Sequence, residues 1–411
     1  MSLCCKQFSF GFVVSLLRGF VSKPMLCLAC RKSETVVWIK THLMAFKVPK
    51  RANLLYAIGG VLLFGVLLQI LTGVSIAIHY VPIISKAFVS VNMFMRKFKY
   101  GWLVRSAHVN GASLMFCALY AHMFRAVYYR SYVGRRRRVW LVGSAIYVLM
   151  MCISFMGYVL PWGQLSYWAA VVVTSFINAM PLVGKRLRLF VLGGHSVRDS
   201  LLKRFFVFHC FLPFVLLLFV VLHVVLVHAS GQNNVVSNRA FAISSRVNMF
   251  PVFVLKDLVF VGLYLLILCA LCLASPSVFS NKLNYEPADF YNTPADIKPE
   301  WYFMHYYSVL RVFESKLAGV LVTGLTLVFV AVLPYIHEDL SSDVLKDLYK
   351  PGVVVLFLSF ALLGVLGAMR LSYWLTVLAR ACVCVYLSFF LWPVTARLMR
   401  VTALNLVAWC C

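Results

Sequence analysis

The chain has 411 residues, of which 63% are hydrophobic and 12% are charged. A soluble globular chain is about 45–50% apolar and about 25% charged, so this composition excludes an ordinary soluble protein and indicates a lipid environment. The 39 Lys and Arg residues outnumber the 12 Asp and Glu residues and give a formal net charge of +27. Because short basic loops separate the apolar stretches, we expect contacts with anionic lipid and no nucleic-acid partner.

Stretches of about 20 apolar residues predict transmembrane helices. A helical bundle also satisfies every backbone polar group within lipid. The predicted fold class is therefore an all-α integral membrane protein with eight transmembrane helices. The predicted spans lie at roughly 54–79, 105–128, 139–160, 205–228, 254–274, 317–335, 352–370 and 374–395.

The chain divides into three predicted regions: an N-terminal extension at 1–50, a four-helix region at 51–230 and C-terminal helices at 231–411. Two connections are too long to be turns, and loops of this size usually carry function. The connection 161–204 is expected to contribute a helical hairpin along the membrane interface. The connection 275–316 contains four prolines, which exclude one continuous helix.

Charge suggests an orientation for these spans. The arginines at 135–138, after the second span, mark that side as the inner face by the positive-inside rule. Basic residues also occur in the connection 161–204 on the other side, so charge alone leaves the orientation open. On this interpretation, the second and fourth spans both run from outside to inside.

Histidines recur at one spacing in the second and fourth spans. His108 and His122 are fourteen residues apart, and so are His209 and His223. Fourteen steps of about 100° end about 40° short of four full turns, so each pair shares one helix face, about 21 Å apart. If the spans lie side by side, His108 meets His209 near the outer face and His122 meets His223 near the inner face. A third such spacing, between His195 and His209, starts in a polar loop and is interpreted as coincidence.

Paired neutral imidazoles within lipid predict a haem, because two nitrogen ligands complete the coordination of its iron and leave no position for a substrate. Such a centre carries electrons. The expected arrangement is therefore a di-haem bundle made of four of the eight helices. The alternative is a haem-free transporter or channel that relays protons or ions through intramembrane histidine and arginine.

Glycines at the same spacing support the haem hypothesis. Gly59 and Gly73 are fourteen residues apart in the first span, and Gly143 and Gly157 are fourteen apart in the third. Glycine in a membrane helix lets another group approach the backbone closely. We expect these glycines to pack against the edges of two haems.

Two arginines accompany the histidines of the second span. Arg105 lies three residues before His108, and Arg125 lies three residues after His122, so each shares its histidine's side of the helix. An arginine near the end of a membrane helix needs a partner or a route to the interface. Each is expected to bind a haem propionate or, alternatively, to be an ordinary flanking anchor.

Glu300 precedes two aromatic residues near the expected outer histidine pair. A carboxyl in a dry pocket has a raised pKa and can take up a proton, as quinol oxidation requires beside an electron acceptor. The residues leave open a second interpretation, in which Glu300 pairs with Lys298 or Arg311. On the inner side, His228 and Asp257 can hydrogen-bond the carbonyls of a quinone and deliver protons, or serve as an interface histidine and a helix cap.

Several short runs of sequence together resemble one family. They are Gln69-Ile-Leu-Thr-Gly73, Tyr100-Gly-Trp-Leu-Val-Arg105, His108-Val-Asn-Gly-Ala-Ser113, Phe155-Met-Gly-Tyr-Val-Leu-Pro-Trp-Gly163, Arg204-Phe-Phe and Lys298-Pro-Glu-Trp-Tyr302. From about Tyr56 through Pro334 the chain resembles cytochrome b, the central subunit of the quinol:cytochrome c oxidoreductase, respiratory complex III. The photosynthetic counterpart is divided between two chains, so a single chain favours the respiratory version.

The resemblance implies a mechanism and roles for the residues. Quinol is oxidised at the outer face, where one electron passes to a Rieske iron–sulfur protein and the other passes through a low-potential and a high-potential b-type haem to a quinone at the inner face. By position, the implied ligands are His108 and His209 for the low-potential haem and His122 and His223 for the high-potential haem. The implied quinol-oxidation residues are Glu300 and Tyr307, and the implied quinone-reduction residues are His228 and Asp257.

The resemblance also implies partners and a location. The expected partners are the Rieske protein, cytochrome c1 and other complex III subunits, within a homodimeric complex in contact with anionic lipid. Ubiquinol and ubiquinone are the expected substrates. The expected location is the mitochondrial inner membrane, which the chain would cross several times.

One departure from the family yields a prediction about inhibitors. Where the family usually has Trp-Gly-Ala, this chain has Trp168-Ala169-Ala170, and the added methyl of Ala169 should crowd the quinol-oxidation pocket. Rigid methoxyacrylate-type inhibitors should therefore bind poorly, whereas a flexible quinol adapts. Titration of quinol oxidation by the isolated complex checks this, and ordinary sensitivity to these inhibitors would contradict it.

Overall fold

Long helices make up most of the structure. The computed structural model describes residues 46–50, 54–232, 246–337 and 343–410. The predicted N-terminal extension lies outside the described residues except for 46–50.

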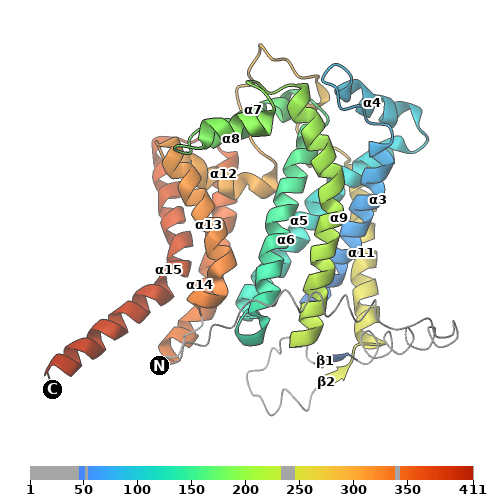
Figure 1. The fold of residues 1–411 in the computed structure, drawn as a ribbon. Helices are drawn as coiled ribbons and strands as arrows, with labels where there is room; N and C mark the ends of the chain where they lie inside the picture. Colours follow the sequence, from blue (N-terminus) through green and yellow to red (C-terminus); the bar gives the residue numbers. More distant parts are fainter. Residues whose placement is uncertain (1–45, 51–53, 233–245, 338–342, 411) are drawn as a thin grey trace, which may run out of the picture.

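Four long helices form a bundle (Figure 1). They are α3 (Ile58–Ala77), α5 (Gly101–Tyr128), α6 (Arg137–Val159) and α9 (Asp199–Ser230). α3 packs along α5, and α6 packs along α9. All four contribute to one buried cluster, which includes Val66, Met115, Phe116, Met150 and Leu216.

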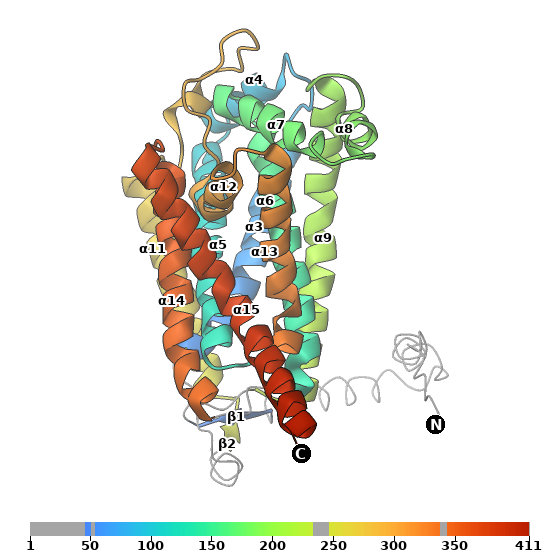
Figure 2. The ribbon, with the colours of Figure 1, turned by 90° about the vertical axis from the view of Figure 1, so that its left-hand side faces the viewer.

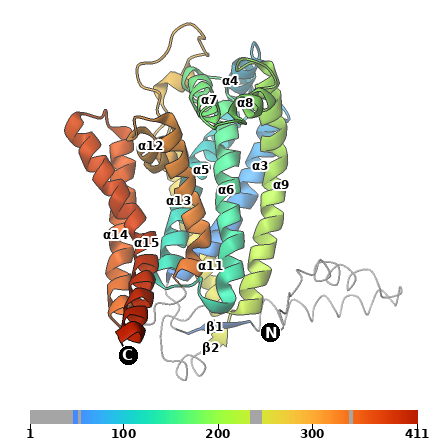
Figure 3. The same ribbon diagram turned by 60° about the vertical axis from the view of Figure 1, so that its left-hand side comes forward.

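The remaining long helices pack around this bundle. α11 (Val252–Ala274) lies against α3 and α5, and α13 (Lys316–Ile336) lies against α6. α14 (Asp343–Ala368) and α15 (Tyr373–Cys410) pack together on the side away from α3 and α9 (Figure 3). These eight helices correspond one by one to the eight predicted spans, so the predicted fold class is confirmed.

Seven helices in the described part of the chain are long and apolar enough to cross a membrane by length and composition. The eighth long helix, α5, is not among them. It carries two histidines and two arginines along its length, which lower its hydropathy. Intramembrane ionisable residues are usually functional, so the polarity of α5 itself points to a site along this helix.

Short elements cover the two ends of the bundle (Figures 1 and 2). One end carries α4 (Ala87–Lys97) and a helical hairpin, as predicted for the connection 161–204, formed by α7 (Gln164–Ile177) and α8 (Gly184–Leu192). The opposite end carries β1 (Lys47–Pro49) and β2 (Arg246–Asn248), which pair antiparallel with Lys47 opposite Asn248. This small sheet was not predicted from the sequence.

Short helices interrupt the connections between the long helices. Two 3-10 helices, η2 (Leu54–Tyr56) and η3 (Gly134–Arg136), precede α3 and α6. The proline-containing connection before α13 holds three further short helices, so it is broken as predicted. These are η4 (Lys282–Tyr285), η5 (Trp301–Phe303) and α12 (Met304–Arg311).

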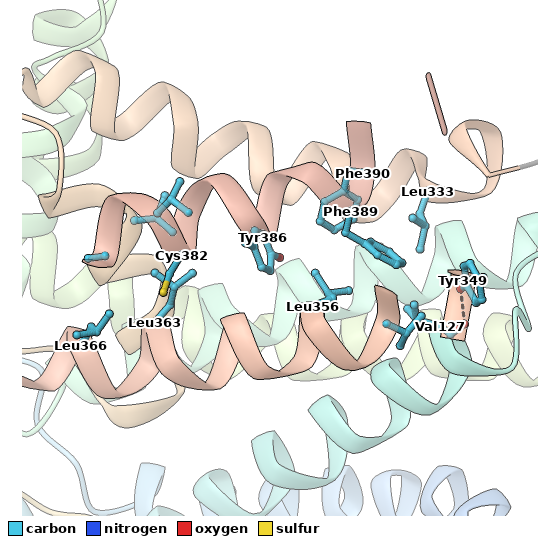
Figure 4. Close-up of a cluster of buried hydrophobic side chains, with 14 of the residues drawn as sticks. Val127, Leu333, Tyr349, Leu356, Leu363, Leu366, Cys382, Tyr386, Phe389 and Phe390 are labelled. Carbon is cyan, nitrogen blue, oxygen red and sulfur yellow. Dashed lines mark hydrogen bonds between the residues drawn. The ribbon is translucent and has the colours of Figure 1, made fainter. Parts of the chain in front are cut away.

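A second buried cluster joins α14 and α15 to the end of α5 (Figure 4). Within it, the Tyr349 hydroxyl of α14 donates a hydrogen bond of 2.6 Å to the Val127 carbonyl of α5. The Tyr132 hydroxyl lies 2.9 Å from the Tyr349 hydroxyl and 3.0 Å from Nδ1 of His337, at the end of α13. Because Tyr132 and His337 are fully buried, these bonds satisfy groups that water cannot reach.

We expect Tyr132→Phe to destabilise the protein, because it leaves the Tyr349 hydroxyl and the His337 imidazole each short of one buried partner. The loss should be about 1–3 kcal/mol in the free energy of unfolding. Thermal unfolding of the purified complex, followed by fluorescence, measures this as a lower transition temperature. Tyr373→Phe is the matched control, since the Tyr373 side chain is 74% exposed; equal transition temperatures for the two variants would contradict the prediction.

Candidate functional site

The four histidines of α5 and α9 lie in two pairs, as the spacing predicted. The ring centroids of His108 and His209 are 6.3 Å apart, with the ring planes at 86°. The ring centroids of His122 and His223 are 6.4 Å apart, with the planes at 62°. α5 and α9 therefore run in the same direction and face each other across the bundle, and the pairs lie at two levels. We call His108 and His209 the outer pair and His122 and His223 the inner pair, after the predicted orientation.

Hydrogen bonds determine which nitrogen carries the proton in the outer pair. The Ile153 carbonyl lies 2.9 Å from Nδ1 of His209, so this nitrogen carries the proton and donates it. Nδ1 of His108 lies 2.9 Å from the Thr72 hydroxyl, which itself donates to the Leu68 carbonyl at 2.8 Å. The Thr72 oxygen therefore accepts from His108. In both rings Nε2 keeps its lone pair, as a metal ligand requires.

Each of the four predicted glycines faces one of the four imidazoles. A Cβ atom at Gly73 would lie 3.0 Å from Cε1 of His108, and one at Gly157 would overlap Cε1 of His209. At the inner pair, Gly143 and Gly59 face His223 and His122, with distances from such a Cβ to Cε1 of 3.1 and 3.7 Å. The glycines thus face the imidazole rings, and their expected packing against the edges of two haems stays a prediction. The physical reason is the same, because glycine alone lets a flat ring approach the helix backbone.

A cavity of about 790 Å³ lies beside the outer pair. Its lining includes Gly73, Arg105, His108, Gly157 and His209. The volume is within the range of about 300–1,000 Å³ that is usual for cofactor and ligand sites. Two metal–imidazole bonds of about 2 Å each would fit between rings at this separation. The residues at this level therefore fit a haem.

At the inner level, the surroundings of Arg125 also fit a haem. Its guanidinium carbon lies 3.5 Å from the centroid of the Tyr56 ring. Nε and Nη2 of Arg125 are buried without a hydrogen-bond partner among the described residues. Since buried N–H donors without an acceptor are costly, an anionic group such as a propionate fits beside these two nitrogens.

The connection before α12 is fastened to the start of α7 by backbone hydrogen bonds. The Gln164 amide donates to the Glu286 carbonyl at 3.0 Å, and the Ala288 amide donates to the Trp162 carbonyl at 3.2 Å. At Gly163 the two segments approach so closely that a Cβ atom would lie 2.7 Å from a backbone oxygen of the connection. These contacts hold the connection over the outer end of the cavity.

Glu300 lines this cavity together with the outer histidine pair. Burial raises the pKa of the Glu300 carboxyl to about 7. The cations that could have paired with it have other partners: Lys298 lies 3.7 Å from Asp296, and Arg311 donates to the Met369 carbonyl at 2.7 Å. The geometry thus favours Glu300 as a proton acceptor in the cavity.

The cavity also contains residues that the sequence analysis did not select. Tyr158, Asn284 and Tyr302 line it, although Tyr158 and Tyr302 stand in the quoted motifs. Tyr158 directly follows Gly157, which was the available signal. Two selected residues, Ala169 and Tyr307, are not among the lining residues of the described chain, and their roles at a quinol site stay predictions.

The residues predicted for the inner face lie at the sheet end of the bundle. The His228 ring stacks on Phe46, with centroids 4.1 Å apart. A Cβ atom at Gly60 would lie 3.3 Å from Cγ of Asp257, while the preceding Gly59 faces His122. Asp257 is therefore next to the inner histidine level. Stacking of His228 on the segment before β1 was not predicted.

Known proteins match the chain over most of its length. The family model described as Cytochrome b/b6/petB matches residues 43–231, and the model described as Cytochrome b(C-terminal)/b6/petD matches residues 287–387. Cytochrome b of Rickettsia prowazekii is 37% identical over 85% of this chain and 88% of its own length. Cytochrome b of Acanthamoeba castellanii is 38% identical over 80% of this chain and 86% of its own length.

A solved structure of a related protein also resembles this chain. A chain of a hyperthermophilic respiratory complex III superposes with a TM-score of 0.81 and 30% identity, over 88% of this chain and 95% of the other. The match therefore includes the arrangement of the helices as well as the sequence. The chain is a multi-pass membrane protein that belongs to the cytochrome b family.

Proposed function

We propose that the chain is the di-haem subunit of a quinol:cytochrome c oxidoreductase, which oxidises quinol at the outer site and reduces quinone at the inner site. The observation that carries this proposal is the pair of imidazole levels between α5 and α9, with Glu300 in the cavity at one of them. A bound haem at each level would supply one-electron acceptance and release. Membership of the cytochrome b family supports this role.

His108 and His209 would hold the low-potential haem, and His122 and His223 the high-potential haem. Their Nε2 atoms would bind the iron, and the opposing glycines on α3 and α6 would let the rings stay close to the helices. Arg105 and Arg125 would bind propionates. Arg105 lines the cavity of the outer pair, and Arg125 has buried donors to spare, which supports both assignments.

Glu300 would take the proton released when quinol gives up its electrons. Burial keeps its pKa near neutrality, so the carboxyl can accept a proton from quinol and later release it. Tyr307 and Ala169 would belong to the same quinol site by family position. At the other end, His228 and Asp257 would hydrogen-bond the quinone carbonyls and supply protons.

The proposed setting is a homodimeric complex with a Rieske protein, cytochrome c1 and further complex III subunits, in contact with anionic lipid. Ubiquinol is the proposed substrate, and the mitochondrial inner membrane is the proposed location. The proposed division of the chain at residue 230 separates the helices that hold the haems, 51–230, from those of 231–411, which complete the quinol site. A match to a respiratory complex III chain supports this setting.

Replacement of one histidine tests the haem assignment. His209→Leu should remove the outer haem, because one imidazole cannot complete the coordination of the iron. A redox titration followed optically counts the haems, and we expect the component of lower potential to be lost. His195→Leu is the matched control, since His195 lies in the exposed loop after α8. If His209→Leu keeps both haems, the assignment is wrong.

Removal of the Glu300 carboxyl tests the quinol site. Quinol oxidation by the wild-type complex should rise with pH through about 7, because the ionised carboxyl accepts the proton and its pKa lies near that value. Glu300→Gln should slow quinol oxidation by about 10²-fold and flatten this rise. Exposed Glu314→Gln serves as the control. An unchanged rate and pH profile in Glu300→Gln would exclude Glu300 as the acceptor.

A further inference from the structure

Asn284, in η4, makes two hydrogen bonds that determine the orientation of its side-chain amide. Its Oδ1 accepts from the Ser166 backbone N–H at 2.9 Å, and its Nδ2 donates to the Tyr158 hydroxyl at 2.9 Å. A backbone N–H can only donate, so the oxygen of the amide must face Ser166. The amide nitrogen must then face Tyr158.

This orientation has a consequence for the Tyr158 hydroxyl. A phenol oxygen has a single proton, and Asn284 already donates to that oxygen. The hydroxyl proton of Tyr158 is therefore directed away from Asn284 and is available to another acceptor. Tyr158 and Asn284 both line the large cavity that contains Glu300.

We infer that Asn284 is a positioning residue for quinol oxidation, which holds the Tyr158 hydroxyl as a hydrogen-bond donor toward an oxygen of the bound quinol. This inference rests on the proposed function. By accepting from the Ser166 backbone N–H, the same amide also links η4 to the first turn of α7, which fixes the position of Asn284 beside Tyr158. The cavity presents further charged and titratable groups from α5, α9 and η5, including Arg105, His209 and Tyr302, which the test leaves unchanged.

Asn284→Asp separates this role from a merely structural one, because aspartate has the same shape and two acceptor oxygens but no N–H donor. One oxygen can still accept from Ser166. The other must accept from Tyr158, which turns the hydroxyl proton away from the quinol. The measurement is steady-state quinol oxidation by the complete complex at about pH 8, where an ordinary aspartate is ionised.

We expect the substitutions at Asn284 and Tyr158 to be strongly coupled in a double-mutant cycle. Asn284→Asp and Tyr158→Phe should each lower kcat/KM by about three- to tenfold, the effect of one lost hydrogen bond. The double variant should be no slower than either single variant, since both remove the same donor. Asn281→Asp is the matched control: exposed Asn281 lies in the same turn and accepts from the Leu283 N–H at 3.0 Å, which aspartate can also do.

Wild-type kcat/KM in Asn284→Asp, or losses that multiply in the double variant, would overturn the inference. If Asn284→Asp does not assemble, the infrared difference between wild type and Tyr158→Phe gives the C–O stretch of Tyr158. If this C–O frequency is that of a phenol that both accepts and donates hydrogen bonds, the inference is supported. If it is that of a phenol that only donates, to Asn284, the inference is overturned. If Tyr158→Phe and Glu300→Gln both oxidise quinol normally, the proposed quinol site itself is wrong.

Discussion

The structure depends on keeping four neutral imidazoles inside a helical bundle. A buried polar group without a partner costs about 1–3 kcal/mol, a cost that hydrogen bonds avoid at the outer pair. In the outer pair, Nδ1 of His209 is satisfied by a backbone carbonyl and Nδ1 of His108 by Thr72. The paired Nε2 atoms are left for a ligand held between the rings. Parallel α5 and α9, and glycine on the helices opposite, are the conditions under which such pairs can form.

The same requirement explains how apolar and polar surface is distributed among the helices. α5 carries one histidine and one arginine at each level and packs against α3, α11 and α14. It also buries Asn110 and Ser113. α9 carries the other two histidines but exposes large apolar side chains such as Phe211 and Leu218, as a lipid-facing helix does. The most polar long helix is thus largely covered by protein, and other helices such as α9 provide the lipid-facing surface.

The sequence was sufficient to predict features that repeat at a regular spacing along the chain. Length and hydropathy located all eight long helices, and the fourteen-residue spacing predicted which histidines meet. The sequence was insufficient for the contacts that irregular connections make with distant segments. The bond between Asn284 and Tyr158 spans 126 residues, and that between Tyr132 and His337 spans 205. Such pairs depend on how irregular connections fold back, for which helical periodicity holds no information.

The outer connection shows how an irregular segment can still hold a reactive group in place. Non-helical backbone near a membrane must find partners for its N–H and C=O groups. Here the segment around Glu286 bonds to the turn between α6 and α7, and Asn284 adds side-chain bonds to Ser166 and Tyr158. These bonds fix the path of the chain before it reaches Glu300. Because these bonds hold the connection over the cavity, the Glu300 carboxyl can remain buried there with a pKa near neutrality.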